Sequence, residues 1–365
     1  MRGRVTNGPS IRAVSFAVAA AASVLLAACG GQTAPASASP ASVSAASASA
    51  AAPAPASGKA LTKVVEGLPT RDFGYLPSFV AQDRGFFAEE GLQVELPNMT
   101  SQVAIPALTN KQIQFGAHGS AERAAYQGAP LKGVWYAWKY NTFYAIASKD
   151  VKTYKDLKGK VLAIASAGGS DDQVLHALLK REGIATSDVQ ILPMGGGPQR
   201  AKALVGGQAQ FTLENPDVAV QLQEQGFTNL GSLGDVLPVP WSGFAVHTDT
   251  IRDQPQMLHG WLKAQTRALL FIKQNPKETA DIAVKELDVT QDVAEKAIPL
   301  LTQAISDDDP GGLTQQGLIV NTQADMDALH LTGDPLELGR KVNDMAPLRA
   351  VQKELGIHCT GGLDC

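Results

Sequence analysis

The feature of this sequence that most constrains its fold is a regular alternation of short apolar segments with longer amphipathic ones after residue 60. Residues 92–96 alternate apolar and polar side chains, as a half-buried strand does, whereas residues 161–165 are apolar throughout, as in a strand covered on both faces. A helical pattern follows the first strand and ends at Gly91, and another runs from Ser170, expected as an N-cap, to Gly183. Strands that alternate with helices predict an α/β fold with mostly parallel sheets.

The start of the chain predicts export from the cytoplasm. Arginines at the very beginning are followed by an uncharged, largely apolar stretch over residues 13–28, which is too short to span a bilayer comfortably. The sequence Leu-Ala-Ala-Cys-Gly around Cys29 resembles a bacterial lipobox, in which small residues admit the signal peptidase and the thiol receives a diacylglyceryl group. We therefore expect a signal peptide over residues 1–28 and lipidation of Cys29. Plain secretory cleavage near Ala28 is the alternative.

A segment of very low complexity follows the expected anchor. Residues 33–57 contain only Ala, Ser, Pro, Thr and a single Val, a composition that cannot bury a core. We expect a disordered tether over residues 29–60 that reaches at most about 100 Å, because a Pro-rich chain extends by about 3.1 Å per residue. A lipid anchor and a tether predict a protein held at a membrane, in the periplasm or at the cell surface.

The charges and cysteines exclude several classes of protein. The net charge is −4 and lysine and arginine are not clustered, so a nucleic-acid partner is not expected. Three cysteines in 365 residues exclude a disulfide scaffold. Cys359 and Cys365 can close a small disulfide loop in an oxidising compartment, and a metal site made by these two residues with His358 is the less favoured alternative. No metal ion or cofactor is expected.

Three motifs carry a resemblance to a known family. Residues 79–94 read Phe-Val-Ala-Gln-Asp-Arg-Gly-Phe-Phe-Ala-Glu-Glu-Gly-Leu-Gln-Val, residues 114–116 read Gln-Phe-Gly, and residues 156–161 read Asp-Leu-Lys-Gly-Lys-Val. In this order they resemble the periplasmic substrate-binding proteins of ABC importers, in the nitrate/sulfonate/taurine and pyrimidine-precursor branch. The resemblance extends over residues 61–331, roughly.

The resemblance implies a two-lobed periplasmic-binding-protein fold of type II. Each lobe would be a mixed, mostly parallel sheet flanked by helices, and two crossover strands would join the lobes. The expected boundaries are residues 61–148 for the first part of lobe 1, residues 149–243 for lobe 2, and residues 244–365 for the return to lobe 1 and the C-terminal helices. The resemblance also implies a monomer that closes around a small-molecule ligand and delivers it to an ABC permease in the membrane.

Ligand contacts in such a fold come from loops at the carboxyl ends of strands. Carried onto this sequence, the expected ligand-binding residues are Phe73, Tyr75, His118, Ser120, Tyr140, Asn141, Ser166, Gly168, Gly169, Ser170, Glu214, Asn215 and Trp241. Alternatives stay open for three of them: His118 as a satisfied loop histidine, Ser120 as a helix N-cap, and Glu214 as a cap of the following helix. Asp171 and Asp172, in the first turn of a helix, compete with a small anion for its positive end.

The expected function is capture of a small ligand for import, either a sulfonate, aromatic or pyrimidine-like molecule or a nitrate-type anion. Aromatic side chains beside Glu214 and Asn215 favour a planar organic ligand with polar edges over a bare inorganic anion. An enzyme is not expected, because His118-Gly119-Ser120 is no nucleophile elbow; a pyrimidine-synthesising relative of the family is a remote alternative. A tethered sensor for a signalling receptor uses the same cleft and closure, so the sequence does not separate it from a transport component.

Overall fold

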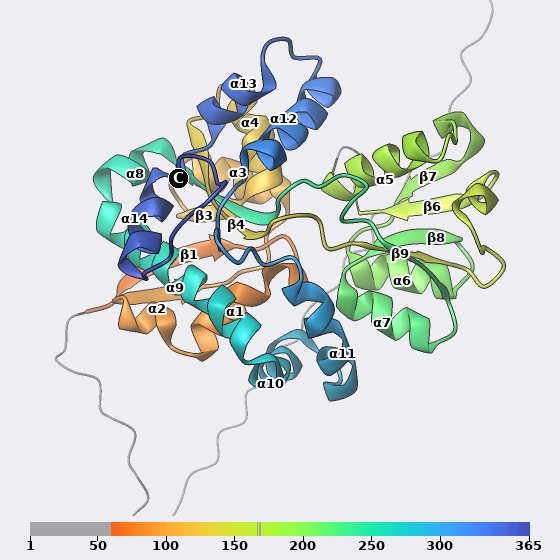
Figure 1. The fold of residues 1–365 in the computed structure, drawn as a ribbon, viewed down its shortest axis with the longest axis horizontal. Helices are drawn as coiled ribbons and strands as arrows, with labels where there is room; N and C mark the ends of the chain where they lie inside the picture. The colour runs from red at the N-terminus through yellow and green to blue at the C-terminus, as the bar shows by residue number, and fades with distance from the viewer. Residues whose placement is uncertain (1–59, 166, 168) are drawn as a thin grey trace, which may run out of the picture. The chain divides into compact units, whose positions relative to one another are not determined.

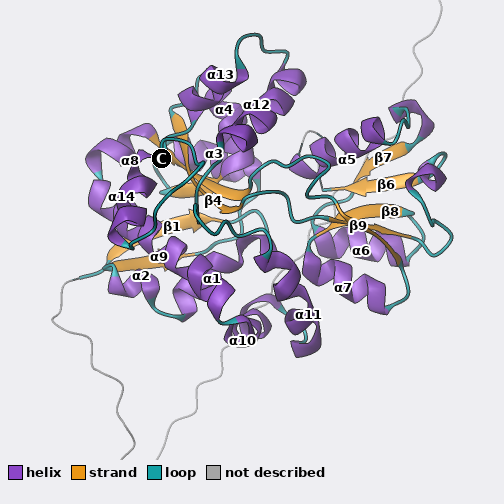
Figure 2. Cartoon of the chain, in the orientation of Figure 1, coloured by secondary structure: helices purple, strands orange, loops and turns teal. Residues whose placement is uncertain are grey.

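Two five-stranded mixed sheets, each flanked by helices, form the two lobes of the protein (Figure 1, Figure 2). The computed structural model describes residues 60–165, 167 and 169–365, and these residues belong to one compact unit. The expected signal peptide, the expected tether up to residue 59, and Cys29, Ser166 and Gly168 lie outside the described residues. The predicted two-lobed α/β class is confirmed.

Lobe 1 is built on a sheet with the strand order β2-β1-β3-β10-β4. Its strands are β1 (Thr62–Gly67), β2 (Leu92–Glu95), β3 (Phe115–Ala117), β4 (Leu131–Trp138) and β10 (Trp241–His247). β1 pairs in parallel with β2 and β3, whereas β10 runs antiparallel to β3 and β4. In β2, Leu92 and Val94 are buried and Gln93 and Glu95 are exposed, so the alternation read from the sequence places the strand correctly.

Lobe 2 is built on a sheet with the strand order β7-β6-β8-β5-β9. Its strands are β5 (Tyr144–Ala147), β6 (Val161–Ile164), β7 (Gln190–Pro193), β8 (Phe211–Glu214) and β9 (Thr228–Ser232). β6 pairs in parallel with β7 and β8, and β5 runs antiparallel to β8 and β9. Both sheets therefore share one plan, in which the antiparallel strand is the one that has just arrived from the other lobe.

The chain passes between the sheets twice, over residues 139–143 and residues 233–240. β5 pairs with strands of lobe 2, although the expected boundary put residues up to 148 in lobe 1. β10 already pairs with lobe 1 from Trp241, before the boundary expected after residue 243. Both differences have one reason: a local pattern identifies a strand, while its partner strands lie far away in the sequence.

The helices fall into the same two groups. Those of lobe 1 are η1 (Phe73–Tyr75), α1 (Leu76–Asp83), α2 (Phe86–Glu89), α3 (Ser101–Thr109), α4 (His118–Tyr126), α8 (Thr248–Asp253), α9 (Pro255–Gln274), α10 (Pro276–Leu287), α11 (Gln291–Thr302), α12 (Gln315–Leu329), α13 (Pro335–Val342) and α14 (Ala346–Glu354). Those of lobe 2 are η2 (Tyr154–Leu157), α5 (Ser170–Arg181), η3 (Thr186–Asp188), α6 (Gly197–Val205) and α7 (Pro216–Glu224). In the described part of the chain, none of these helices combines the length and the hydrophobicity needed to cross a bilayer.

The helix expected to end at Gly91 is divided in two at Gly85. α1 ends at Asp83, Gly85 adopts a φ of 73° in the left-handed region, and α2 begins at the next residue. A residue with this φ cannot continue a right-handed helix, and glycine adopts it without steric cost. The spacing of apolar residues in the sequence continues across this break, because Phe79 and Phe87 are both buried in the same core.

Large aromatic side chains fill the core of lobe 1. Trp135 and Trp261 have no exposed surface, and the Trp261 ring stacks on Phe115 with the ring centroids 3.9 Å apart. The Trp261 Nε1 donates a hydrogen bond of 2.7 Å to Glu66, so its polar atom is satisfied inside the core. Such side chains bury more apolar area than any others and therefore stabilise the lobe strongly.

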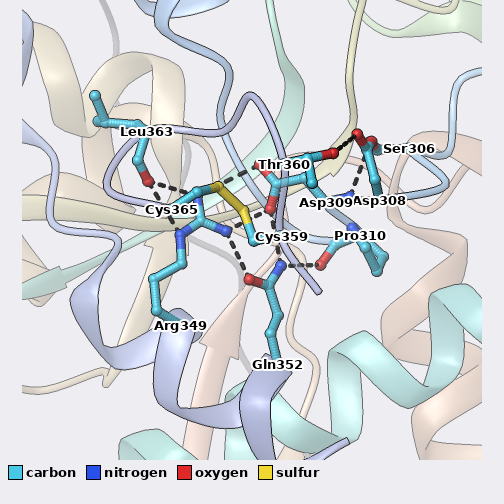
Figure 3. Close-up of a disulfide and its surroundings, with 10 residues drawn as sticks. All are labelled: Ser306, Asp308, Asp309, Pro310, Arg349, Gln352, Cys359, Thr360, Leu363 and Cys365. Atoms are coloured by element: carbon cyan, nitrogen blue, oxygen red, sulfur yellow. Dashed lines mark hydrogen bonds and ion pairs between the residues drawn. A yellow bond between two sulfur atoms is a disulfide. The ribbon is translucent and has the colours of Figure 1, made fainter. Parts of the chain in front are cut away.

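A disulfide between Cys359 and Cys365 closes a small loop within the C-terminal tail (Figure 3). Beside it, the Arg349 Nε donates to the Leu363 carbonyl at 3.0 Å, and the Arg349 guanidinium pairs with the buried carboxylate of Asp309. Leu363 is itself buried. Sulfur atoms in a disulfide are not thiolate ligands, so the disulfide and the alternative metal site exclude each other.

Candidate functional site

A cavity of about 190 Å³ lies where the two lobes meet. Lobe 1 lines it with the loop after β1 and the starts of α3, α4 and β10, and lobe 2 lines it with the starts of α5, α6 and α7. The wall is made by Pro69, Thr70, Asp72, Tyr75, Ser101, Ala117, Gly119, Ser120, Phe143, Ala165, Gly169, Ser170, Asp171, Gly196, Gly197, Arg200, Asn215, Trp241 and Ser242. These segments follow the carboxyl ends of parallel strands, the edge at which open α/β sheets bind ligands.

Seven of the expected ligand-binding residues border this region. Those that line the cavity are Tyr75, Ser120, Gly169, Ser170, Asn215 and Trp241. His118 borders a smaller hollow of about 60 Å³, which shares Tyr75, Ser170 and Trp241 with the main cavity. Six of these seven residues follow the end of a strand, which is the sequence signal that they share, whereas Trp241 is the first residue of β10.

Four expected residues do not line the cavity. Phe73 is wholly buried in the core of lobe 1. The Tyr140 hydroxyl donates to the carbonyl of Gln303 at 3.0 Å. Asn141 and Glu214 are wholly buried and bind other protein groups. These residues were placed by loop order, which does not determine the direction in which a side chain points.

Three aromatic side chains form part of the cavity wall. Tyr75, Phe143 and Trp241 line it, and Trp241 meets Phe143 edge to face with the ring centroids 4.4 Å apart. Tyr75 meets Phe244 in the same way at 5.7 Å. Each ring is thus held in place by a second ring. Burial raises the pKa of Tyr75, so its hydroxyl stays neutral.

The start of α4 differs from the expectation. Ala117 is the N-cap, while Ser120 lies inside the first turn and donates to the Ser101 Oγ at 2.7 Å, so the N-cap interpretation of Ser120 is wrong. His118 is the first residue of the helix and is not in a loop, and its Nε2 lies 2.6 Å from the Oε2 of Glu122. His118 and Ser120 therefore bind different partners, and the two do not form the pair that a hydrolase would need.

The partner of His118 is held by several hydrogen bonds. Burial by itself raises the pKa of Glu122, but the charge and hydrogen bond of His118 and the hydrogen bonds from Asn343 and Asn321 bring the pKa below its usual value. The Asn343 Nδ2 donates to Glu122 at 3.1 Å and the Asn321 Nδ2 at 2.6 Å. This carboxylate fixes the orientation of the imidazole next to the smaller hollow.

The start of α5 brings the two lobes together. Gly169 is the N-cap of α5 and Ser170 is its first helical residue. The observed cap therefore lies one residue before the cap expected from the sequence. Asp171 accepts a hydrogen bond from the Ala165 N–H and so joins the helix to the end of β6. A Cβ added to Gly119, in α4 of lobe 1, would lie 3.2 Å from the Ser170 Oγ. A side chain there would force its neighbour to move, because such a contact is tighter than most real ones.

A buried arginine that the sequence analysis did not single out lies in the lobe 2 wall. Arg200, on α6, is 4% exposed. Its Nη2 lies 3.1 Å from the Oε2 of Glu214, and its Nη1 lies 3.9 Å from the Oδ2 of Asp171. Glu214 is the last residue of β8, and no side chain caps α7. Glu214 is therefore an ion-pair partner and not the cap of α7.

Burial is the largest influence on the pKa values of the carboxyl groups around this arginine. It raises the pKa of Glu214 to about 7, although the charge of Arg200 lowers it. Burial, followed by the charge of Asp72, raises the pKa of Asp217 to about 8. Burial also raises the pKa values of Asp72 and Asp171. Desolvation of the charged forms is the main cause of all four shifts, and the charge of Arg200 opposes the shifts of Asp72, Asp171 and Glu214.

Asp72 and Arg200 are the charged wall residues that sequence reasoning missed. Asp72 is in the loop after β1, next to two residues that were singled out, and Arg200 follows the triple-glycine turn over residues 195–197. A charged side chain close after a strand end is the signal that could have identified both. Their proximity to the same cavity is a property of the fold alone.

The two crossover segments are fastened to each other. The Asn141 Nδ2 donates to the carbonyl of Leu233 at 3.0 Å and to the carbonyl of Leu237 at 2.8 Å. The Thr142 Oγ1 donates to the Asn215 Oδ1 at 3.0 Å, which links the first crossover to the cavity wall in lobe 2. Asn141 therefore binds the backbone of the second crossover.

Comparisons with known proteins agree with this architecture. The riboflavin-binding protein RibY of Chloroflexus aurantiacus is 24% identical over 292 residues, which cover 75% of this chain and 82% of RibY. The periplasmic nitrate-binding protein NrtA of Synechocystis PCC 6803 superposes with a TM-score of 0.66 at 14% identity, over 81% of this chain and 89% of NrtA. The periplasmic aliphatic sulphonate binding protein SsuA of Escherichia coli superposes with a TM-score of 0.61 at 15% identity, over 78% and 92%. A family profile described as NMT1/THI5 like matches residues 72–279, more than half of the sequence, and the chain therefore belongs to the NMT1/THI5-like family.

Proposed function

We propose that this chain is the solute-binding component of an ABC importer, which captures a small organic molecule between its lobes and presents it to a membrane permease. The observation that carries the proposal is the cavity between the lobes, whose wall contains residues of both. A molecule bound there contacts both lobes, binds the closed arrangement better than an open one, and shifts the population toward closure. The names of the relatives describe binding proteins for riboflavin, nitrate and sulfonates, which supports binding over catalysis.

The side chains in the wall define the roles we propose for them. Tyr75 and Trp241 present ring faces to a flat ligand. Ser120 of lobe 1 and Ser170 and Asn215 of lobe 2 supply hydrogen-bonding groups on opposite sides. Closure of the lobes would bring these groups onto one molecule, because the donors and acceptors come from two separate sheets.

The size of the cavity limits the ligand. Pockets that hold drug-sized molecules have volumes of about 300 to 1,000 Å³, whereas this cavity has about 190 Å³. In this arrangement of the lobes the cavity therefore holds a compact molecule, smaller than riboflavin. A larger ligand would require the lobes to move apart.

Thermal unfolding of the purified full-length protein tests the binding proposal. The probes are riboflavin, alkanesulfonates, nitrate, aminopyrimidines, aromatic acids and aromatic amidines. A ligand present at 100 times its Kd adds about 2.7 kcal/mol to the free energy of unfolding, which raises the Tm measurably. Tyr75→Ala and Trp241→Ala are expected to abolish the shift, and Tyr140→Ala is the matched aromatic control because Tyr140 does not line the cavity. An unchanged Tm with every probe would reject a ligand-binding role for these classes.

We also propose that the protein is exported and anchored by a lipid on Cys29. NrtA and SsuA are named as periplasmic proteins, which supports export. The test is phase partitioning of the protein expressed in a bacterium: the wild type is expected in the detergent phase and Cys29→Ser in the aqueous phase. Equal partitioning of the two would rule out the anchor.

The genes that flank the gene for this protein test whether it delivers its ligand to a permease. A neighbouring gene for a protein with several apolar spans and another for an ATPase with G-x-x-x-x-G-K-[ST] would support import. A neighbouring receptor kinase or cyclase would instead support the tethered-sensor alternative, which uses the same cavity.

A further inference from the structure

We infer that the cavity selects a compact organic molecule with a cationic or N–H-rich group, such as an amidinium or a protonated amine, and rejects simple anions. This inference deepens the proposed function and rests on it. It is carried by the charges of the described wall: Asp72 and Asp171 border the cavity as carboxylates, while Arg200, which also borders it, is occupied by protein acceptors.

Four of the five N–H donors of Arg200 already form hydrogen bonds within the protein, and the fifth faces Asp171. A guanidinium has five N–H donors. The Nη2 of Arg200 donates to the Leu213 carbonyl at 2.8 Å and to the Glu214 Oε2 at 3.1 Å, and its Nε lies 3.2 Å from the Glu214 Oε1. The Nη1 donates to the Gly195 carbonyl at 2.9 Å and pairs with Asp171 at 3.9 Å. An anionic ligand would have to break these buried bonds, so Arg200 is not a free anion site.

The two acidic side chains keep room for a ligand. A carboxylate has two oxygens with about four acceptor positions. Asp72 accepts from the Gly74 N–H at 2.9 Å, from the Thr70 Oγ1 at 2.8 Å and from the Asn215 side chain, and Asp171 accepts from the Ala165 N–H and from N–H groups at the start of α5. An N–H-rich ligand can take the positions that remain without displacing these contacts.

The balance of charge favours a cation. Glu214 offsets the charge of Arg200, and Asp72 and Asp171 then add negative charge at the cavity. Burial raises the pKa values of both aspartates, which shows that their charged forms lack solvation. A bound cation would replace the missing solvation with charge-assisted hydrogen bonds.

The aromatic part of the wall favours the same class of ligand. Tyr75, Phe143 and Trp241 line the cavity together with the two aspartates. The face of an aromatic ring attracts a cation, most strongly when both are shielded from water. Carboxylates and ring faces in one small cavity are therefore complementary to an organic cation.

The helix N-termini in the cavity wall differ in the ligand groups that they favour. α4 and α6 begin without a side-chain cap, so N–H groups in their first turns can bind an acceptor atom. The start of α5 instead carries Asp171, whose carboxyl group accepts N–H groups there. The uncapped helices thus suit an acceptor edge on the ligand, while Asp171 opposes an anion at the start of α5.

The test compares probes of the same shape and opposite charge on the full-length protein. The pairs are benzamidine with benzoate and phenethylamine with 3-phenylpropionate, and nitrate is included as a simple anion; Tm is measured against concentration. At least one cation is expected to raise the Tm while its anionic partner does not. Asp72→Asn and Asp171→Asn, which keep the shape of the side chain, should weaken the apparent affinity for that cation by about tenfold or more, because a charge-assisted bond becomes a neutral one.

Asp188→Asn is the matched control, because Asp188 is paired with the exposed Lys158 and lies outside the cavity. A Tm increase with benzoate, 3-phenylpropionate or nitrate but not with the cations would overturn the inferred ligand class and leave the binding function intact. An undiminished cation response in both aspartate variants would also overturn it. No response to these probes or to the wider panel would reject the binding function together with the inference.

Discussion

The guanidinium of Arg200 lies 3.1 Å from the carboxylate of Glu214, and both side chains are buried. The pair joins α6 to the end of β8, and Arg200 itself lines the cavity on the lobe 2 side. A buried ion pair of this kind positions the wall and, by occupying the arginine, determines which charges remain available to a ligand.

Removing one partner of this pair should destabilise the protein strongly. Glu214→Gln leaves Arg200 buried without its counter-charge, so we expect the free energy of unfolding to fall by about 3–5 kcal/mol in urea denaturation. Glu224→Gln is the matched control, because Glu224 pairs with Lys296 on the surface, and it should change little. Similar unfolding midpoints for the two variants would contradict the structural role of Glu214.

Asp217 should make the stability depend on pH. Its pKa is raised by burial from 3.8 to about 8, so between these values the folded state binds a proton that the unfolded state has lost. The free energy of unfolding therefore falls as the pH rises from about 4 to about 8, by at most about 1.4 kcal/mol per pH unit for this group. Asp217→Asn should flatten the decline in urea denaturation across this range. Parallel curves for wild type and variant would disprove the contribution of Asp217.

The C-terminal disulfide should contribute to stability through the short loop it closes. Cys359 and Cys365 are six positions apart, and closing such a loop stabilises a protein by about 2 kcal/mol in the chain-entropy model. The variant with both cysteines changed to serine should lose this amount in urea denaturation. Mild reduction of the wild type is the control and should give the same loss, whereas an unchanged midpoint in both would argue against a bonded pair.

Asn141 should matter for both stability and binding. Asn141→Ala removes the side-chain hydrogen bonds to the carbonyls of Leu233 and Leu237, which keep backbone N–H donors, so we expect a loss of about 0.5–1.5 kcal/mol for each bond. Because these bonds tie the two crossovers, we also expect weaker binding of any ligand found by thermal unfolding. The exposed Gln208→Ala is the control. Normal ligand affinity in a folded Asn141→Ala protein would show that Asn141 does not contribute to lobe closure.

The sequence by itself determined the kind and order of the elements. The strands over residues 92–96 and 161–165 were predicted within one residue of their observed ends, and the helix after β6 was predicted within one residue of its start. The three family motifs likewise identified the family and the two-lobed class. These successes have a common cause: side-chain periodicity, glycine ends and short motifs all act over a few consecutive residues.

Only the tertiary structure decided which residues meet. It placed β5 in the lobe 2 sheet, turned Phe73 into the core of lobe 1, and brought Asp72 to the wall that contains Arg200. The pairing of Arg200 with Glu214 likewise follows from the parallel arrangement of β8 beside β6, and no local pattern encodes it. Strand partners, side-chain directions and buried charge pairs depend on contacts between segments far apart in the chain, and their energies exist only once those segments have packed together.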